Sequence, residues 1–493
     1  MRTRTVFADC LIPQPGAATL DRVAIGIDND RISALEQAGH EPPAVAKASS
    51  RRLVMPALSN AHDHARVARN SAMGGFDKPL ESWLFRLALI PAADPWLCSA
   101  VSFARSALGG VGSIMIHYTR IQGLTDFTTE VGQVVKALRD VGLRGAFAVQ
   151  CRDRNPIVYG PHDAVLASLS PASRAAMEKR FLKPALPAAE QVALVEAIAA
   201  EYEDASLTVQ FGPAAVQWCS DPLLRLIAER SAATGRRVHM HLLETKYQRA
   251  WADREFPNGI VRYLDEIGLL SPRLSLAHCV WARPDEYELI AERGATIVVN
   301  TSSNLAIRSG RAAIDAMLRA GCRVAMGMDG VALDEDEDAL REMRLNYALN
   351  KGAGVEAAMS PAALLAFATV NGRFALDGGR RGSRASGRIE PGADADLLSL
   401  DLDALSSDLI EPHVPAIDLL LARAGKQHVQ DLIVAGKDVV RDGKLAHLDL
   451  PALEADLLAR FRRDLLTTED LRGAMPELER VLNERLATHG GCC

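Results

Sequence analysis

The sequence predicts an α/β protein built on a (β/α)8 TIM barrel, with a small β-sandwich formed by both chain termini. Eight short apolar runs, rich in β-branched residues, have the length and character of strands buried on both faces, and each is followed by a helical or loop stretch. This alternation is typical of a closed parallel barrel. A doubly wound sheet is the alternative, but no G-x-G-x-x-G follows the first run, which disfavours it.

The expected barrel strands follow one another through the middle of the chain. They are residues 53–64, 112–118, 144–150, 207–214, 236–244, 273–280, 295–300 and 323–330. The expected helices between them include 188–204, 221–235 and 284–294. Gly235 and Gly294 stand where two of these helices should end, as glycine often does at a helix C-terminus.

The two ends of the chain have a different pattern. Residues 1–52 and 388–447 contain alternating, turn-punctuated runs that are typical of antiparallel strands, so we expect them to combine in one β-sandwich domain. Residues 53–387 would then form the catalytic barrel, and residues 448–493 a charged helical tail.

One long insertion, residues 151–187, joins the third strand to its helix. In a barrel such a loop lies over the C-terminal mouth. Two interpretations stay open: a lid or wall of the substrate site, and a peripheral segment without substrate contact.

Composition excludes several classes of protein. The 493 residues carry a net charge of −6 and offer no basic stripe, which argues against a nucleic-acid partner. No apolar run of about 18 residues and no long apolar N-terminal region occur, so we expect neither a membrane span nor a signal peptide. The eight cysteines are scattered without a C-x-x-C pair. We therefore expect a cytoplasmic protein.

Histidines and carboxylates gather where the expected strands end. His62 and His64 lie two residues apart on the first strand, so both would face the barrel axis, and two rigid imidazoles suit a divalent transition metal. Other strands bring His117, His239, His241, Glu244, His278 and Asp329 towards the same rim. A single such histidine is more often a hydrogen-bonded core group, but packing does not explain several strands supplying these groups to one rim.

These residues resemble the motifs of the amidohydrolase superfamily, and most closely its cytosine deaminase, chlorohydrolase (triazine hydrolase) and methylthioadenosine deaminase branch. HDH at 62–64 matches the family's H-x-H, and HLLET at 241–245 matches its H-x-x-E-T. His278 matches the lone histidine of strand six, and GMDG with Asp329 matches G-T-D-G. DKPLESWL at 77–84 is similar to a further family segment, and the likeness covers nearly the whole chain.

The resemblance implies a metal-dependent hydrolase of a non-peptide C–N bond, with deamination of an amino-substituted N-heterocycle as the first expectation. It implies one divalent metal ion per chain, with zinc first and Fe2+ or another divalent ion as the alternatives. The implied ligands are His62, His64, His241 and Asp329. Two-metal relatives carry a bridging lysine at the end of strand four, and QFGPAAVQW has none there, which favours one ion.

The resemblance also implies roles for individual residues. Asp329 would accept a proton from the metal-activated water, His278 would orient that water and stabilise oxyanion charge, and Glu244 would move a proton to a ring nitrogen or the departing amine. His239 is expected to be a hydrogen-bonded interior group. The tentative substrate contacts are His117, Gln217, Trp218 and Asn304.

Two departures from the family limit what is expected of the substrate. Ala214 and Val299 stand where the family often has histidines after strands four and seven, so an ordinary adenosine-type substrate is disfavoured. The alternatives with the same metal are hydrolysis of an amide, urea or carbamate, and a triazine-type chlorohydrolase. A non-catalytic assembly protein would show gaps in the ligand set, and none is missing. The resemblance further implies a small-molecule substrate and a homo-oligomer, a dimer or larger.

Overall fold

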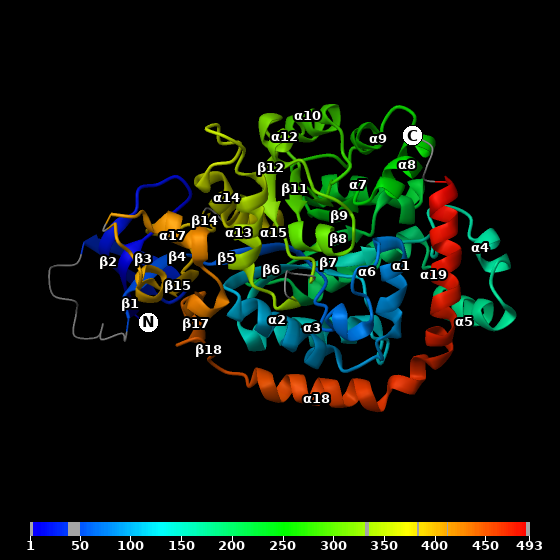
Figure 1. Cartoon of the computed structure of the whole chain (residues 1–493), viewed down its shortest axis with the longest axis horizontal. Coiled ribbons are helices and arrows are strands. Elements are labelled where there is room, and N and C mark those ends of the chain that lie inside the picture. Colours follow the sequence, from blue (N-terminus) through cyan, green and yellow to red (C-terminus); the bar gives the residue numbers. More distant parts are fainter. Residues whose placement is uncertain (1–2, 38–49, 331–334, 382–383, 412, 490–493) are drawn as a thin grey trace.

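A computed structural model describes residues 3–37, 50–330, 335–381, 384–411 and 413–489. It contains two eight-stranded sheets, one forming a barrel surrounded by helices and one built from both chain ends (Figure 1). Within the described ranges, no helix is both long enough and apolar enough to cross a bilayer.

The first sheet is the predicted parallel barrel, in the order β12-β11-β10-β9-β8-β7-β6-β5. Its strands are β5 (Leu58–Asp63), β6 (Val111–Tyr118), β7 (Arg144–Cys151), β8 (Leu207–Pro213), β9 (Val238–Leu242), β10 (Leu274–His278), β11 (Thr296–Val299) and β12 (Arg323–Met326). The ring closes because the backbone N–H groups of Met328 and Asp329 both donate to the carbonyl oxygen of His62, at 3.2 and 2.8 Å.

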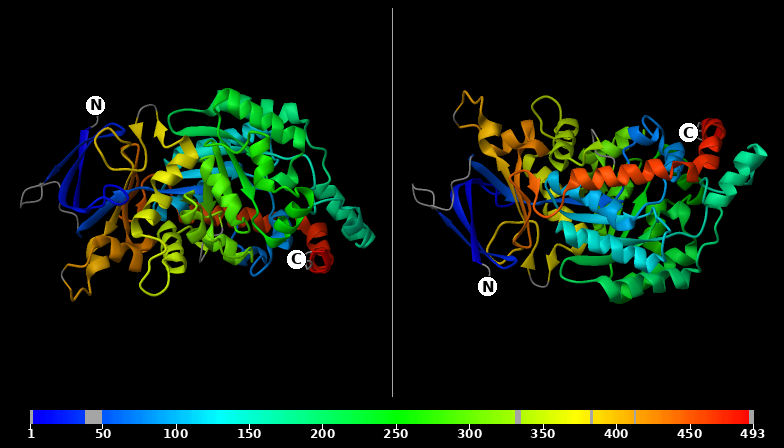
Figure 2. Two further views of the ribbon diagram at one scale, coloured as in Figure 1. Left: turned by 90° about the horizontal axis from the view of Figure 1, so that it is seen from above. Right: turned by 90° about the horizontal axis from the view of Figure 1, so that it is seen from below.

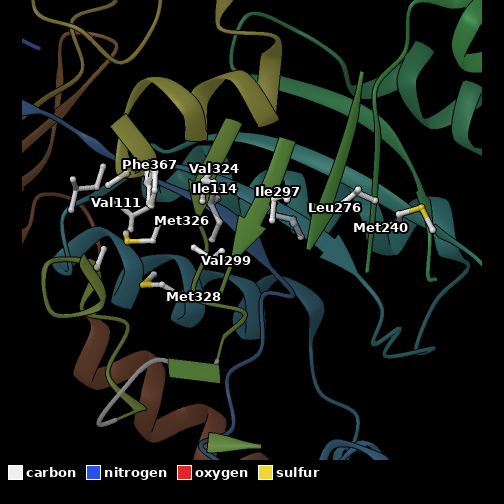
Figure 3. Packing of buried hydrophobic residues seen from close by; sticks show 14 of the residues in the cluster. Val111, Ile114, Met240, Leu276, Ile297, Val299, Val324, Met326, Met328 and Phe367 are labelled. Carbon is white, nitrogen blue, oxygen red and sulfur yellow. The ribbon is translucent and has the colours of Figure 1, made fainter. Parts of the chain in front are cut away.

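Helices surround the barrel on its outer side. They are α2 (Pro95–Leu108), α3 (Phe127–Val141), α6 (Ala188–Tyr202), α7 (Asp221–Thr234), α8 (Lys246–Glu255), α9 (Ile260–Glu266), α10 (Pro284–Glu292), α11 (Thr301–Ala306), α12 (Ile314–Arg319), α13 (Ala339–Asn350) and α14 (Pro361–Ala368). α15 (Val370–Asp377) instead contacts β5, β6, β7, β11 and β12 and places Leu376 in the interior of the barrel. Apolar side chains on the outer face of the strands pack against these helices. Figure 3 shows part of this core, with Ile297 and Val324 on neighbouring strands beside Phe367 of α14.

Small side chains fill the interior of the barrel. Ala61, Ala146, Ala148 and Ala325 are fully buried there, together with Leu376 of α15.

The second sheet confirms that the two termini combine. Its order is β18-β17-β16-β15-β4-β1-β2-β3. The strands are β1 (Thr3–Leu11), β2 (Leu20–Asp28), β3 (Arg31–Gln37), β4 (Arg52–Pro56), β15 (Leu397–Asp401), β16 (Val429–Val434), β17 (Lys437–Arg441) and β18 (Lys444–Leu445). The short α16 (Leu402–Ser406) and α17 (Ala416–Arg423) connect β15 to β16.

The first expected barrel strand, 53–64, is two strands in the structure. β4 pairs with β1 and β15 of the terminal sheet, and β5 pairs with β6 of the barrel. The chain crosses between the sheets at Ala57, whose N–H donates to Asp396, while the N–H of Leu58 donates to Gly110. Pro56 ends β4 because it has no N–H for a ladder. The limits of the three expected domains stay a prediction.

Two further groups of helices come from the insertion and from the last part of the chain. The insertion 151–187 forms α4 (Asp163–Ala167) and α5 (Pro171–Phe181). The chain's last part forms α18 (Leu450–Arg463), which runs along the barrel, and α19 (Glu469–His489), which lies beside α5 (Figures 1 and 2). α1 (Leu80–Arg86) also packs against α19. α4, α5 and α19 lie at the end of the molecule opposite the terminal sheet (Figure 1).

Candidate active site

Five side chains from four strands lie together at the carboxyl end of the barrel. They are His62, His64, His241, His278 and Asp329, and all are buried. Asp329 Oδ1 lies 3.3 Å from His62 Nε2 and 3.0 Å from His64 Nε2. The Nε2 atoms of His64 and His241 lie 3.3 Å apart. The structure therefore brings the four expected metal ligands into one cluster.

Hydrogen bonds fix the orientation of two of these imidazoles. His64 Nδ1 lies 2.6 Å from the carbonyl oxygen of His117, and His241 Nδ1 lies 2.6 Å from that of Ala214. A carbonyl oxygen only accepts, so each Nδ1 must carry the proton and donate it. The Nε2 lone pairs of both rings are left facing the cluster.

The orientation of His62 follows from a chain of buried groups. Ser275 Oγ donates to the carbonyl of Val238, at 3.3 Å, and lies 2.7 Å from His239 Nδ1, from which it accepts. His239 Nε2 is then an acceptor, and His62 Nδ1 donates to it at 2.7 Å. His62 Nε2 is left as a buried atom with a lone pair and no hydrogen-bond donor. His239 is thus the hydrogen-bonded interior group that the sequence predicts.

Three Nε2 lone pairs and one carboxylate oxygen make a donor set that could hold a divalent metal ion. Such sites commonly use imidazole nitrogens whose other nitrogen donates to a carbonyl or another acceptor, as here. Burial lowers the pKa of His62 and His241 well below the usual value, and that of His64 to about 4. The imidazoles are therefore neutral at pH 7, as metal ligation requires.

Asp329 is held in place from several sides. It has a φ of 59°, a left-handed conformation that aspartate tolerates at the end of a strand. Ser303 Oγ donates to its Oδ2 at 2.5 Å, and Arg66 Nη1 donates to its backbone oxygen at 2.9 Å. Burial acts to raise the pKa of Asp329, but the positive charge of Arg66 and the neighbouring imidazoles of His62 and His64 outweigh it. The pKa lies well below the usual value, and the carboxylate is ionised.

His278 and Glu244 lie beside this cluster. His278 Nδ1 donates to Asn304 Oδ1 at 2.8 Å, which leaves Nε2 as an unpartnered buried acceptor. Glu244 Oε1 lies 3.8 Å from His278 Nδ1 and 3.4 Å from Ser309 Oγ. Burial raises the pKa of Glu244 to about 7, so this carboxyl group exchanges a proton near neutral pH. Carboxyl groups with raised pKa values are typical of proton-transfer sites.

A cavity of about 280 Å³ opens above the cluster. Its floor includes His64, His241, Glu244, His278 and Asp329. The insertion contributes Arg152, Ile157, Tyr159, Arg180 and Phe181 to the walls, and α19 contributes Leu482 and Leu486. The insertion is therefore a wall of the cavity, which favours the interpretation as a wall of the substrate site.

The four expected substrate contacts differ in position. Trp218 lines the cavity. His117 lies deeper, fully buried, with Nε2 3.1 Å from the carbonyl of Gly212. Gln217 is buried below the wall, and Asn304 orients His278. Since His117, Gln217 and Asn304 are not among the residues that line the cavity, the structure gives no contact that supports a role for them in substrate binding.

Sequence reasoning did not single out a polar cluster in the cavity wall. Glu81 Oε1 accepts hydrogen bonds from Thr245 Oγ1 at 2.5 Å and from Tyr159 OH at 3.0 Å, and Oε2 is buried without a donor. Burial raises the pKa of Glu81. The signal for Glu81 was present, because it lies in the family-like segment 77–84. Tyr159 lies in the insertion, where no motif marks it.

Comparison with known proteins agrees with this geometry. The 5-methylthioadenosine/S-adenosylhomocysteine deaminase of Halobacterium salinarum is 30% identical over 414 residues, which are 83% of this chain and 86% of that protein. The 5'-deoxyadenosine deaminase of Methanosarcina mazei is 26% identical over 89% of this chain and 93% of its own length.

Solved structures give the same fold. An adenosine deaminase from Xanthomonas campestris with bound zinc superposes with a TM-score of 0.76 at 25% identity, covering 94% of this chain and 98% of that one. The atrazine chlorohydrolase of Arthrobacter aurescens, complexed with zinc, superposes with a TM-score of 0.73 at 21% identity, covering 92% and 98%, which shows the fold alone. A family model described as "Amidohydrolase family" matches residues 53–444. The chain therefore belongs to the amidohydrolase family.

Proposed function

We propose that this protein deaminates an amino-substituted N-heterocycle by hydrolysis, using one divalent metal ion held by His62, His64, His241 and Asp329. Hydrolysis of C–N bonds other than peptide bonds is the activity of its deaminase relatives. The observation that carries the proposal is the convergence of three Nε2 lone pairs and one carboxylate at the floor of a cavity that also contains Glu244. Zinc is the first candidate ion because two structural neighbours contain it.

When bound, the ion would act as a Lewis acid that lowers the pKa of a water molecule towards about 7. The other steps belong to the chain's own residues. Asp329 is ionised, and its Oδ1 lies at the centre of the cluster, so it can accept a proton from the attacking water. Ser303 and Arg66 hold the carboxylate in position for this transfer.

His278 orients the attacking water. Because Nδ1 donates to Asn304, the free Nε2 accepts a hydrogen bond from the water and fixes the direction of its lone pair. The same nitrogen stabilises a developing oxyanion only after it has gained a proton.

Glu244 moves the second proton. At neutral pH a substantial fraction of the molecules carry a proton on this carboxyl group, because burial has raised its pKa to about 7. The protonated form can donate a proton to a ring nitrogen or to the departing amine. The ionised form can then accept a second proton, which Asp329 has taken from the water and passed to the substrate. The group is therefore suited to a shuttle between water and leaving group.

The amidohydrolase relatives are named for nucleoside substrates, but this cavity differs from the family pattern at Ala214. Ala214 lines the cavity with a methyl group, where the family often has an imidazole. We therefore propose a heterocycle other than an ordinary adenosine as substrate. An amide, urea, carbamate or chlorotriazine would use the same centre, and the product test below separates these reactions.

The test is a screen of zinc-loaded protein against aminopurines, pterins, triazines and aryl ureas. Each substrate is scored for ammonia, amine and chloride. Ammonia from at least one amino-heterocycle supports the proposal. Release of only amine or only chloride would contradict deamination and show that the protein catalyses one of the alternative reactions.

We also propose three properties of the whole molecule. These are the division into a terminal domain (1–52 with 388–447), a barrel domain (53–387) and a tail (448–493), a homo-oligomeric state, and a cytoplasmic location. The cysteines in the described part of the chain are free thiols, which fits a reducing compartment. Light scattering and limited proteolysis would test the assembly and the domain limits.

A further inference from the structure

Two neighbouring residues of α11 orient the groups that handle protons at the candidate site. Ser303 Oγ donates to Asp329 Oδ2 at 2.5 Å, and Asn304 Oδ1 accepts from His278 Nδ1 at 2.8 Å. Ser303 and Asn304 are both buried. The positions of Asp329 and His278 therefore depend on where this one helix lies.

α11 has only six residues, Thr301–Ala306. A helix of this length is not stable alone, because few hydrogen bonds form within it and the N–H groups of its first turn have no partner inside the helix. Its position must come from the segments around it, and it packs against α13.

A buried carboxylate of α13 holds the start of α11. Glu342 Oε1 accepts from the backbone N–H of Ser302 at 3.1 Å, and Glu342 Oε2 accepts from the hydroxyl of the same serine. Glu342 is only 1% exposed. A carboxylate in this place satisfies N–H groups that the helix itself cannot satisfy, and its charge interacts favourably with the positive end of the helix dipole.

Asn346, one turn further along α13, completes the contact. Its Oδ1 accepts from Thr301 Oγ1 at 2.7 Å, and its Nδ2 donates to the backbone oxygen of Glu342 at 2.9 Å. Burial raises the pKa of Glu342 to about 6, although hydrogen bonds from Ser302 act in the other direction. Buried polar networks whose members are hydrogen-bonded restrict movement, so this network fixes the first turn of α11.

Glu342 has no direct access to the reaction. It is not among the residues that line the cavity. Any effect of Glu342 on the chemistry must therefore pass through α11, by way of Ser303 and Asn304.

We propose that Glu342 is a positioning residue, which anchors α11 and thereby keeps Ser303 against Asp329 and Asn304 against His278. This inference rests on the proposed function, because that function supplies the roles of Asp329 and His278. Groups that hold a metal ligand from behind typically contribute 10–100-fold to metal affinity or activity, so a loose α11 should have a measurable effect.

Binding of Co2+ alone tests the Asp329 side of the proposal without a substrate. Chelator competition measures the Kd of Co2+ for the full chain, and the visible absorption of the bound ion reports its ligand geometry. Glu342→Ala should weaken binding about 10-fold and change the absorption, because Asp329 is no longer held in place. Glu342→Gln keeps an oxygen for the N–H of Ser302, so it should recover most of the affinity.

Asp153 supplies a matched control. Its carboxylate accepts from the N–H and from the hydroxyl of Ser220, at 2.7 and 2.6 Å, at the start of α7. These are the same two contacts with a different helix, and neither Asp153 nor Ser220 lines the cavity. Asp153→Ala should lower the melting temperature, as Glu342→Ala does, but should leave Co2+ binding unchanged.

Ser303→Ala separates the proposed path from a general loss of stability. In this variant the contact between α11 and Asp329 is already lost, so the addition of Glu342→Ala should weaken Co2+ binding by less than about twofold. A further loss of about 10-fold in the double variant would overturn the proposal, since the effect would then not pass through Ser303.

Two other results would overturn the proposal: unchanged Co2+ binding in Glu342→Ala, and an equal loss of Co2+ binding in Asp153→Ala. If Glu342→Ala does not fold, Ser302→Ala removes the same hydroxyl contact from the other side, and Ser220→Ala is its control. Absence of ammonia release from every compound in the substrate screen would contradict the proposed function and leave the Co2+ result intact.

Discussion

The floor and the outer wall of the cavity are built in opposite ways. The floor comes from the ends of β5, β9 and β10 and the turn after β12. His64 and His241 are held by backbone carbonyls of the barrel, and His278 and Asp329 by Asn304 and Ser303 of α11. The outer wall comes from α1, the insertion and α19, which meet through an apolar cluster that includes Phe85, Met177 and Leu478. The comparison teaches that the candidate metal ligands are positioned by strand ends, whereas the outer wall of the cavity is built from segments that only tertiary packing brings together.

The largest effect is expected at the floor. His64→Ala removes one of three imidazole nitrogens and the hydrogen bond to the carbonyl of His117. Bound metal and ammonia release should be lost together, which elemental analysis and an ammonia assay would measure on the same sample. Full metal content in this variant would remove His64 from the ligand set.

Glu244→Gln should separate metal binding from turnover. The amide keeps the shape of the side chain but cannot carry the proton, so kcat should fall by about 10²–10⁴-fold while the metal content stays at one ion. A variant with the original kcat would show that another group moves the proton.

Ser275→Ala tests the chain of groups behind His62. Without the serine oxygen, His239 loses the acceptor that fixes its tautomer, and His62 is no longer oriented. We expect metal affinity to fall by about 10-fold, measured by chelator competition, since such outer partners typically contribute 10–100-fold. Ser59→Ala is the control, because Ser59 is a buried serine of β5 whose side-chain oxygen bonds, among the residues that the structure describes, to Ser113 alone. Equal losses of metal affinity in the two variants would show that the tautomer of His239 does not control metal binding.

The smallest effect is expected at the wall. Leu482→Ala removes apolar surface that α19 presents to the cavity, and KM should rise a few-fold while metal content and kcat stay close to those of the unmodified protein. Leu458→Ala on α18 is the control, since that side chain is 47% exposed and does not line the cavity. A fall in kcat alone would show that α19 acts on the chemistry and not on substrate fit.

The sequence predicts the floor well and the wall poorly, for a physical reason. Strand periodicity places His62, His64 and His241 on inward faces wherever the strands lie, so the rim follows from local pattern. Leu482 lies on α19, more than 400 residues after the first barrel strand. Its contacts depend on where this helix docks, and the local hydrophobic pattern of the sequence does not encode that position. The same limit explains the strand at 53–64, where Pro56 and the pairing of β4 with distant strands divide one apolar run between two sheets.

Anomalous diffraction from crystals of the zinc-loaded protein tests the central claim most directly. One zinc ion per chain should lie about 2.0–2.2 Å from the Nε2 atoms of His62, His64 and His241 and from Asp329 Oδ1. A second ion in the same cavity, or an ion held without one of these four residues, would contradict the single-metal site on which the proposed chemistry depends.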